Sequence, residues 1–377
     1  MTAPAGPTAN LHLVAAITEG IEKFAGLPTL QHEYDVIESR GNQTYIYGWA
    51  IDPDRQWTRA DLYLNGELVA SCEPHEREDV TSALPQFKFG RMSGFNFGSE
   101  DADVGNGHTD RADLVFYDGD QPIATVFTPV RTDLETFVPL PPEHLMKRVI
   151  GSGDPTQFKR FALYCFGQYL AAANRHREFS GIKKMLDWGC GCGRVTAHYL
   201  RIGNGPEVYG CDIDGEDIAW CKANLADGVF ETTSPFVPLP YEAGSFDLVV
   251  SLSVLTHLSK DQQADWLREI DRVLAHGGLF IGSVHGYSAA LRGGEYLSER
   301  LKREPFFDDL SDEILDGIAP KGYYRATFQT PDYTRKAFGK VFDILEYIDR
   351  GVGIQDLVVA RKKDARAGGV LGWMRGR

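Results

Sequence analysis

An acidic residue followed by three alternating glycines is the pattern in this sequence with the most chemical content. Asp187 comes directly after an apolar run, and the glycines that follow it are Gly189, Gly191 and Gly193. This order predicts a buried strand, a tight turn and the start of a helix. Glycines let the backbone adopt positive φ angles and approach a ligand, and a helix start offers unpaired N–H groups. The pattern therefore predicts a ligand site at the carboxyl edge of a parallel sheet.

A second acidic residue stands where a ribose-binding carboxylate is expected. Asp212 ends the apolar stretch 208–212, about twenty residues beyond the last glycine, a spacing at which an acid reaches a pair of ribose hydroxyls. A nicotinamide cofactor would favour the pattern Gly-x-Gly-x-x-Gly, in which a pyrophosphate lies on the helix start. The tighter Gly-x-Gly-x-Gly turn, with Asp187 before it, suits a cationic or zwitterionic ligand instead.

Five segments, in this order along the chain, resemble class I S-adenosylmethionine-dependent methyltransferases. They are residues 185–194, 210–212, 239–250, 253–258 and 272–279. The resemblance covers about residues 150–362 and implies a Rossmann-like α/β fold with a mostly parallel sheet of seven strands. The segments Trp-Gly-Cys-Gly-Cys-Gly-Arg and Ser-Val-Leu-Thr-His-Leu resemble those of bacterial methyltransferases associated with glycan assembly.

The resemblance implies S-adenosylmethionine as the cofactor and assigns residues to it. Asp187 is expected near the methionine part or its ammonium group, and Asp212 is expected to accept from both ribose hydroxyls. Many members hold the adenine amino group with an acid, but segment 231–235 has no Asp, so Thr232, Thr233 or backbone groups are expected there. The other expected cofactor-binding residues are Gly189, Cys190, Gly191, Gly193, Arg194, Ile213 and Ser251.

Two histidines are candidate general bases. Methyl transfer from a sulfonium is an in-line displacement, in which the protein mainly aligns nucleophile, methyl group and sulfur. A base assists an alcohol acceptor by taking its proton, and imidazole titrates near neutrality. His257 and His285 follow predicted strands on the ligand side. A histidine at the His257 position is a recurrent base in the family's O-methyltransferases, while capping or packing of the next helix is the alternative role.

The acceptor is expected to bind to a cap. Residues 286–330 do not fit a simple alternation of strand and helix, and they resemble the substrate cap that this family inserts after its fifth strand. The expected substrate-binding residues in it are Tyr287, Tyr323, Tyr324 and Arg325.

The sequence also predicts helices and domain boundaries around this site. A helix is expected over residues 158–173, and another opens at Ser259, with Gln262 completing a capping box, and ends at Gly277. The methyltransferase domain then spans residues 156–362. The Pro- and Gly-containing residues 131–155 are expected as a linker, and residues 363–377 as a basic tail.

The region before the linker has a different sequence pattern. Residues 1–31 are expected to be disordered or a short helix. Residues 32–130 alternate β-forming runs with turn signals and predict an all-β, sandwich-like accessory module. Trp49, Trp57 and Tyr63 are candidates for stacking on sugar rings, and a place in the module's core is the alternative.

Composition limits the possible partners. The chain has 377 residues, 43% of them hydrophobic, and a net charge of −14, which disfavours nucleic acid. No apolar run approaches the ~20 residues that span a bilayer, and the N-terminus does not resemble a signal peptide, so a cytoplasmic protein is expected. The six cysteines lack the spacing of a zinc site, so no metal is expected. The oligomeric state stays open.

These patterns support a leading hypothesis and two alternatives. The leading one is O-methylation of a sugar hydroxyl in a glycan or glycolipid, with the all-β module holding the glycan or its assembly machinery. The second is methylation of an unrelated small metabolite at oxygen, nitrogen or carbon. The third is a non-catalytic scaffold that retains the cofactor fold, which the presence of both Asp187 and Asp212 disfavours.

Overall fold

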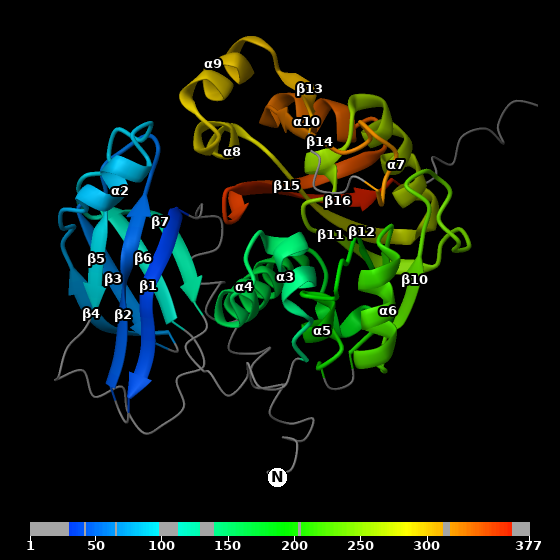
Figure 1. Ribbon diagram of the computed structural model, residues 1–377, viewed down its shortest axis with the longest axis horizontal. Helices are drawn as coiled ribbons and strands as arrows, with labels where there is room; N and C mark the ends of the chain where they lie inside the picture. Colours follow the sequence, from blue (N-terminus) through cyan, green and yellow to red (C-terminus); the bar gives the residue numbers. More distant parts are fainter. Residues whose placement is uncertain are drawn as a thin grey trace, which may run out of the picture.

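Two parts of the chain stand out in the computed structural model, an all-β module and an α/β domain (Figure 1). The structure describes residues 30–40, 43–64, 66–97, 112–128, 139–202, 205–311 and 317–363. We call residues 30–128 the N-terminal module and residues 139–363 the α/β domain. Apart from residues 30, 31 and 363, the expected N-terminal helix and basic tail lie outside the described residues.

Seven strands form the central sheet of the α/β domain, in the order β10-β9-β8-β11-β12-β16-β15. Neighbouring strands run parallel except for the pairs β12–β16 and β15–β16, which are antiparallel. The expected mostly parallel sheet of seven strands is therefore confirmed. The strands are β8 (Lys184–Trp188), β9 (Glu207–Asp212), β10 (Val229–Thr232), β11 (Phe246–Ser251), β12 (Leu274–Val284), β15 (Phe342–Val352) and β16 (Gln355–Lys362).

The strand order reverses between β8 and β11. The chain runs outward from β8 through β9 to β10, and then returns to β11 on the other side of β8. Loops that leave the carboxyl ends of two such strands diverge, and the crevice between them is where open α/β sheets bind ligands. The topology therefore places the glycine turn after β8 at this crevice.

Two hydrophobic clusters cover the two faces of the sheet. Successive strand residues alternate between them, so that Met185 packs into one cluster and Leu186 into the other, each fully buried. The helix α4 (Pro155–Asn174) covers the first face, and α7 (Lys260–Val273) covers the second. The helix expected over 158–173 is thus present, and it packs on one face of the sheet.

The helix α7 begins as expected and ends earlier than expected. The Ser259 hydroxyl accepts from the backbone N–H of Gln262, and the side-chain Oε1 of Gln262 accepts from the backbone N–H of Ser259 at 2.7 Å, which completes the capping box. The expected end at Gly277 was wrong. Leu274 is fully buried and pairs with Phe246, so the chain already enters β12 at that residue.

Shorter elements complete the domain. The described part of the range 131–155, expected as a linker, contains the helix α3, and the described part of the range 286–330, expected as a cap, contains two helices and two strands. These elements are α3 (Glu143–Ile150), η2 (Phe179–Gly181), α5 (Thr196–Tyr199), α6 (Gly215–Asn224), η3 (Leu255–His257), α8 (Tyr287–Arg292), α9 (Glu295–Arg303), β13 (Phe306–Ser311), β14 (Arg325–Gln329) and α10 (Pro331–Phe338).

The N-terminal module consists of two antiparallel sheets that share one hydrophobic core. Their orders are β1-β2-β5 and β4-β3-β6-β7. Trp57 is 1% exposed and donates from Nε1 to Ala50 O at 2.8 Å, and Trp49 is buried as well, so the core interpretation is confirmed for both. The elements are β1 (Gln31–Arg40), β2 (Gln43–Ile51), β3 (Arg59–Leu64), β4 (Glu67–Cys72), α2 (Glu78–Ala83), β5 (Gly94–Phe97), β6 (Ala112–Asp118) and β7 (Gln121–Thr128).

Neither a membrane span nor a metal cluster occurs in the described ranges. None of the helices there is long and apolar enough to cross a bilayer. No group of three or more His, Cys, Asp or Glu side chains in those ranges is placed to hold a metal ion. The six cysteines are free thiols, and all but Cys72 are buried.

Candidate functional site

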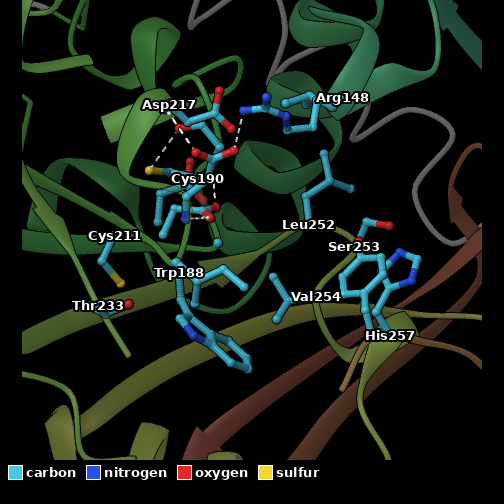
Figure 2. A pocket seen from close by; sticks show the side chains of 18 of the residues that line it. Arg148, Trp188, Cys190, Cys211, Asp217, Thr233, Leu252, Ser253, Val254 and His257 are labelled. Carbon is cyan, nitrogen blue, oxygen red and sulfur yellow. Dashed lines mark hydrogen bonds and ion pairs between the residues drawn. The ribbon is translucent and has the colours of Figure 1, made fainter. Parts of the chain in front are cut away.

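A pocket opens at the carboxyl ends of β8, β9 and β11, where the strand order reverses (Figure 2). The expected site residues that line it are Asp187, Gly189, Cys190, Gly191, Arg194, Asp212, Ile213, Thr233, His257, Tyr323 and Tyr324. Lining residues to which the sequence did not point include Arg148, Val149, Trp188, Asp214, Asp217, Leu252, Ser253, Val254 and Trp266. The pocket therefore gathers residues from seven separate stretches of the chain, between Arg148 and Tyr324.

The glycine turn is held too tightly for any larger residue. Gly189 has a φ of +78°, and a Cβ there would lie 2.1 Å from the Val254 Cγ2 atom. Gly193 has a φ of +74°, and a Cβ there would lie 2.5 Å from the Leu225 Cδ1 atom. Gly193 is not among the lining residues, so its absent side chain makes room for α6 rather than for a ligand.

The carboxylate of Asp212 is oriented by backbone N–H groups. One oxygen accepts from Gly191 N at 2.8 Å and the other accepts from Asp214 N at 2.9 Å. Burial raises the pKa of the Asp212 carboxyl above its ordinary value. The side chain is half-buried in the pocket wall, so it can also accept from a ligand.

Asp187 lies deeper in the pocket. It is 4% exposed, and the Thr196 hydroxyl donates to its Oδ2 at 2.6 Å. Burial raises its pKa to about 6, against the lowering effect of the Thr196 hydrogen bond, and the like charge of Asp212 raises it further. The two carboxylates therefore make this end of the pocket favourable for cationic groups.

Further ionisable residues that the sequence analysis missed lie beside these two carboxylates. Arg148 of α3 pairs with Asp214, the N-cap of α6, and with Glu216 at 3.1 Å. Asp217 is 3% exposed, its Oδ1 has no hydrogen-bond partner among the described residues, and burial raises its pKa to about 8. Asp212, Asp214 and Asp217 are close together in the sequence at the end of β9, and this spacing could have indicated that all three lie at the pocket. The contribution of Arg148 depends on how α3 packs, which no local pattern reveals.

His257 lies in the pocket wall in a fixed orientation. Its Nδ1 lies 3.0 Å from the carbonyl oxygen of Arg325, and its ring stacks on Tyr324 with a centroid separation of 3.9 Å. A carbonyl only accepts, so Nδ1 carries the hydrogen, and the lone pair of the neutral ring is on Nε2. Burial lowers the pKa of His257 to about 4, so the ring is neutral at physiological pH.

Four other expected residues do not line the pocket. His285 stacks on Phe328, and its ring centroid lies 6.2 Å from that of His257. Ser251 is fully buried beneath the site. Tyr287 is 38% exposed at the start of α8. The Arg325 guanidinium donates to the backbone carbonyls of Gly322 and Asp308. Arg325 contributes to the site through its own carbonyl oxygen, which contacts His257 Nδ1.

The pocket fits a ligand that carries both charges. Arg194 is 7% exposed, and its Nε and Nη1 have no hydrogen-bond partner among the described residues. Its guanidinium lies over the ring of Phe161, 4.8 Å from the centroid, and can receive a carboxylate. The acidic side chains opposite it favour an ammonium or sulfonium group. An amino acid bearing a sulfonium and a ribose meets this pattern.

Known proteins resemble this region. Residues 186–282 match a family profile described as "Methyltransferase domain". An uncharacterized protein of Haemophilus influenzae is 33% identical over 27% of this chain and 43% of its own length. Ajmaline N-methyltransferase of Rauvolfia serpentina is 30% identical over 27% of this chain and 36% of its own length. The chain thus spans less than half the length of these curated relatives.

Solved structures resemble the chain more weakly. The magnesium protoporphyrin IX methyltransferase of Synechocystis, solved with bound S-adenosylhomocysteine, is 18% identical and covers 58% of this chain and 94% of its own. The TM-score of this pair is 0.41.

The family match and the strand order together define the class of the domain. The chain contains a class I S-adenosylmethionine-dependent methyltransferase domain with a Rossmann-like sheet. S-adenosylmethionine is the cofactor of this domain. When bound, it supplies a methyl group that is already activated on a sulfonium.

Proposed function

We propose that the whole protein is a methyltransferase that acts on a hydroxyl group, with His257 as general base. The observation that carries this proposal is the orientation of His257 in the pocket wall, with Nδ1–H donating to Arg325 O. This hydrogen bond selects the tautomer whose Nε2 can accept a proton. Together with the stacking on Tyr324, this bond fixes the ring at the pocket wall, where a base for the acceptor is required.

The proton and electron balance is simple. The acceptor oxygen forms a bond to the methyl carbon as the carbon–sulfur bond breaks, and the sulfur keeps the electron pair. His257 takes the hydroxyl proton at Nε2 and later releases it to solvent. Asp187, Asp212 and Arg194 hold and orient the methyl donor in this proposal, so that the acceptor meets the methyl carbon in line.

The acceptor class that we propose is a sugar hydroxyl in a glycan or glycolipid. Aromatic side chains favour the faces of sugar rings, and Tyr324 supplies one beside His257. Two further tyrosines are exposed on the adjoining helices, Tyr287 at 38% and Tyr296 at 64%. The domain boundaries, the substrate cap, the sandwich-like accessory role of the N-terminal module and the cytoplasmic location stay predictions.

The N-methyltransferase among the relatives favours one alternative. An amine acceptor in a small metabolite also loses a proton on methylation, and His257 could accept it. This alternative is separated from the first by measuring S-adenosylhomocysteine formation with panels of glycans and of small amines. Turnover of amines alone would contradict the sugar acceptor while leaving the methyltransferase proposal intact. No turnover with either panel, despite cofactor binding, would favour the scaffold.

The role of His257 is tested by His257→Gln. Glutamine can still donate to Arg325 O but cannot take a proton, so kcat should fall by about 10²–10⁴ with little change in cofactor affinity. The matched control is His276→Gln, because His276 is exposed and outside the pocket. A His257→Gln variant with kcat within about threefold of wild type would contradict the proposal.

The pH dependence gives an independent check. The basic form of His257 is the neutral ring, which is present above its pKa of about 4. With cofactor saturating, kcat should therefore stay level from about pH 9 to pH 6 and fall only as the pH approaches 4. An unperturbed histidine would instead halve the rate near pH ~6.5. A fall in kcat at that higher pH would rule out His257 in this environment as the base.

A further inference from the structure

The tip of the β15–β16 hairpin, residues 350–355, is the place where three parts of the molecule meet. Figure 1 shows this hairpin reaching from the sheet toward the N-terminal module. The tip contacts the module through Arg350, α4 through Gly353, and the pocket wall through Gln355. The tip therefore links the module to the pocket, and each of the three contacts can be followed in turn.

On the module side, a buried ion pair holds the tip. Arg350 Nη1 lies 3.9 Å from Asp52 Oδ1, and the two side chains are only 4% and 1% exposed. Asp52 also pairs with Arg55 at 3.7 Å. Beside this pair, Leu291 of α8 packs against a cluster of the module that includes Trp49. Within the hairpin, Arg350 Nε also donates to Asp349 Oδ2 at 2.9 Å. Asp52 is therefore the second acid beside this buried guanidinium, and the one that comes from the module.

Hydrogen bonds to Asp356 and Tyr164 hold the tip. Arg350 has a φ of +52°, which is uncommon for a residue with a side chain, and its N–H donates to Asp356 Oδ1 at 2.8 Å. The Tyr347 hydroxyl donates to the other oxygen of Asp356 at 2.5 Å. Gly353 N donates to the Tyr164 hydroxyl at 3.0 Å. A displacement of Arg350 would therefore move the tip as a unit.

On the pocket side, the tip holds Ser253. Gln355 Nε2 donates to Ser253 Oγ at 3.0 Å, and Ser253 lines the pocket with a φ of +61°. Its N–H donates to Ser283 Oγ at 2.7 Å. Strained backbone of this kind persists only where the surroundings hold it, and here the surroundings include Gln355.

The conformation of Ser253 sets the position of the residues after it. Its Oγ lies 3.1 Å from Thr256 Oγ1 within the turn that leads to His257. Between them, Val254 makes the close approach to the glycine turn at Gly189. A shift at Ser253 would thus move the proposed base relative to the cofactor turn.

We propose that the N-terminal module positions the acceptor side of the pocket in cis. Asp52 holds the hairpin tip through Arg350, and Gln355 acts as a positioning residue that keeps Ser253 and hence His257 in place. The effect on methyl transfer rests on the proposed function. The structural coupling does not, because it concerns the order of residues 253–258.

The first experiment measures that order without any acceptor. Amide hydrogen exchange of residues 253–258 is followed by mass spectrometry in the full chain for Asp52→Asn, Gln355→Met and the control Asp118→Asn. Methionine keeps the size of Gln355 but cannot donate, and Asp118 is exposed at the end of β6. Exchange should accelerate about fivefold or more in the first two variants and stay unchanged in the control. Unchanged exchange in Asp52→Asn would overturn the link to the module, and unchanged exchange in Gln355→Met would overturn the link to the pocket.

A double variant guards against simple unfolding of the module. Removing only Asp52 leaves Arg350 buried without that partner, whereas Asp52→Asn combined with Arg350→Gln removes both charges. Exchange of residues 253–258 should then lie closer to wild type than in Asp52→Asn alone. Equal acceleration in both would show that the variant disrupts the module rather than the ion pair, and would overturn the proposal.

Activity supplies the readout that separates positioning from stability. In Gln355→Met, kcat should fall about tenfold while the Kd for S-adenosylmethionine stays within about twofold. Ser253→Ala removes the same hydrogen bond together with the contact to Thr256 Oγ1, so adding Gln355→Met to Ser253→Ala should cost no further activity. Loss of cofactor binding together with kcat would indicate general destabilisation and contradict a positioning role. Absence of turnover in the wild type would defeat the proposed function but leave the exchange results decisive.

Discussion

At Asp212, both carboxylate oxygens are already held by the N–H groups of Gly191 and Asp214. These bonds fix the direction in which the remaining lone pairs point into the pocket. A ribose hydroxyl pair that reaches them would find an acceptor that needs no reorientation, so we propose that this side chain contributes strongly to cofactor affinity.

The change Asp212→Asn tests this contribution. Asparagine keeps the size of the side chain but removes the charge-assisted hydrogen bonds, so the affinity for S-adenosylmethionine should fall by about 1.5–3 kcal/mol, roughly ten- to a hundredfold. Isothermal titration calorimetry measures it, with Asp227→Asn as control because Asp227 is exposed and outside the pocket. Equal affinities of wild type and Asp212→Asn would remove Asp212 from the cofactor site.

At the scale of elements, α3 covers one side of the pocket through Val149. Arg148 ties this helix to α6 by its pairs with Asp214 and Glu216. The left-handed Gly151 ends the helix at the pocket edge. We therefore propose that α3 slows the release of the cofactor from this pocket.

We expect Arg148→Gln to raise the dissociation rate of S-adenosylmethionine about fivefold, since a partly exposed ion pair contributes about 1 kcal/mol. Stopped-flow fluorescence can follow this, because Trp188 and Trp266 line the pocket. Lys147→Gln is the matched control on the same helix, where Lys147 pairs with Glu143 away from the pocket. If the dissociation rate rose equally in both variants, or in neither, the proposed role of the Arg148 ion pairs in retaining the cofactor would be contradicted.

The elements also show what sequence could and could not predict. The strands around Asp187 and Asp212 were predictable because apolar runs, glycine turns and acids lie next to one another along the chain. The end of α7 was not, because Leu274 satisfies a helical pattern until its pairing with Phe246 in the sheet is known. Arg148 was missed for a similar reason, since its partners lie on another helix.

At the scale of the whole molecule, the N-terminal module and the α/β domain meet through apolar as well as charged contacts. Leu291 of α8 packs against the cluster that contains Trp49 and Ile51. Such contacts make the two parts stabilise each other, so their unfolding should be coupled.

The change Leu291→Ala should therefore lower the free energy of unfolding by about 1–2 kcal/mol, less than the cost of a fully buried leucine because Leu291 is half-buried. Urea denaturation with linear extrapolation measures it. The control is Leu68→Ala, because Leu68 is 55% exposed on β4, and its cost should stay below about 0.5 kcal/mol. Similar values for the two variants would show that the interface contributes no stability.

The pair between Asp52 and Arg350 has a consequence for protein engineering. A chimaera that joins another β module to this α/β domain before residue 139 would retain Arg350 and lose Asp52. Recombination at that boundary would leave the buried Arg350 with Asp349 as its remaining ion-pair partner and with no acid facing it from the module. Module exchange should therefore preserve the orientation of the two parts best where the incoming module brings an acid to the same place.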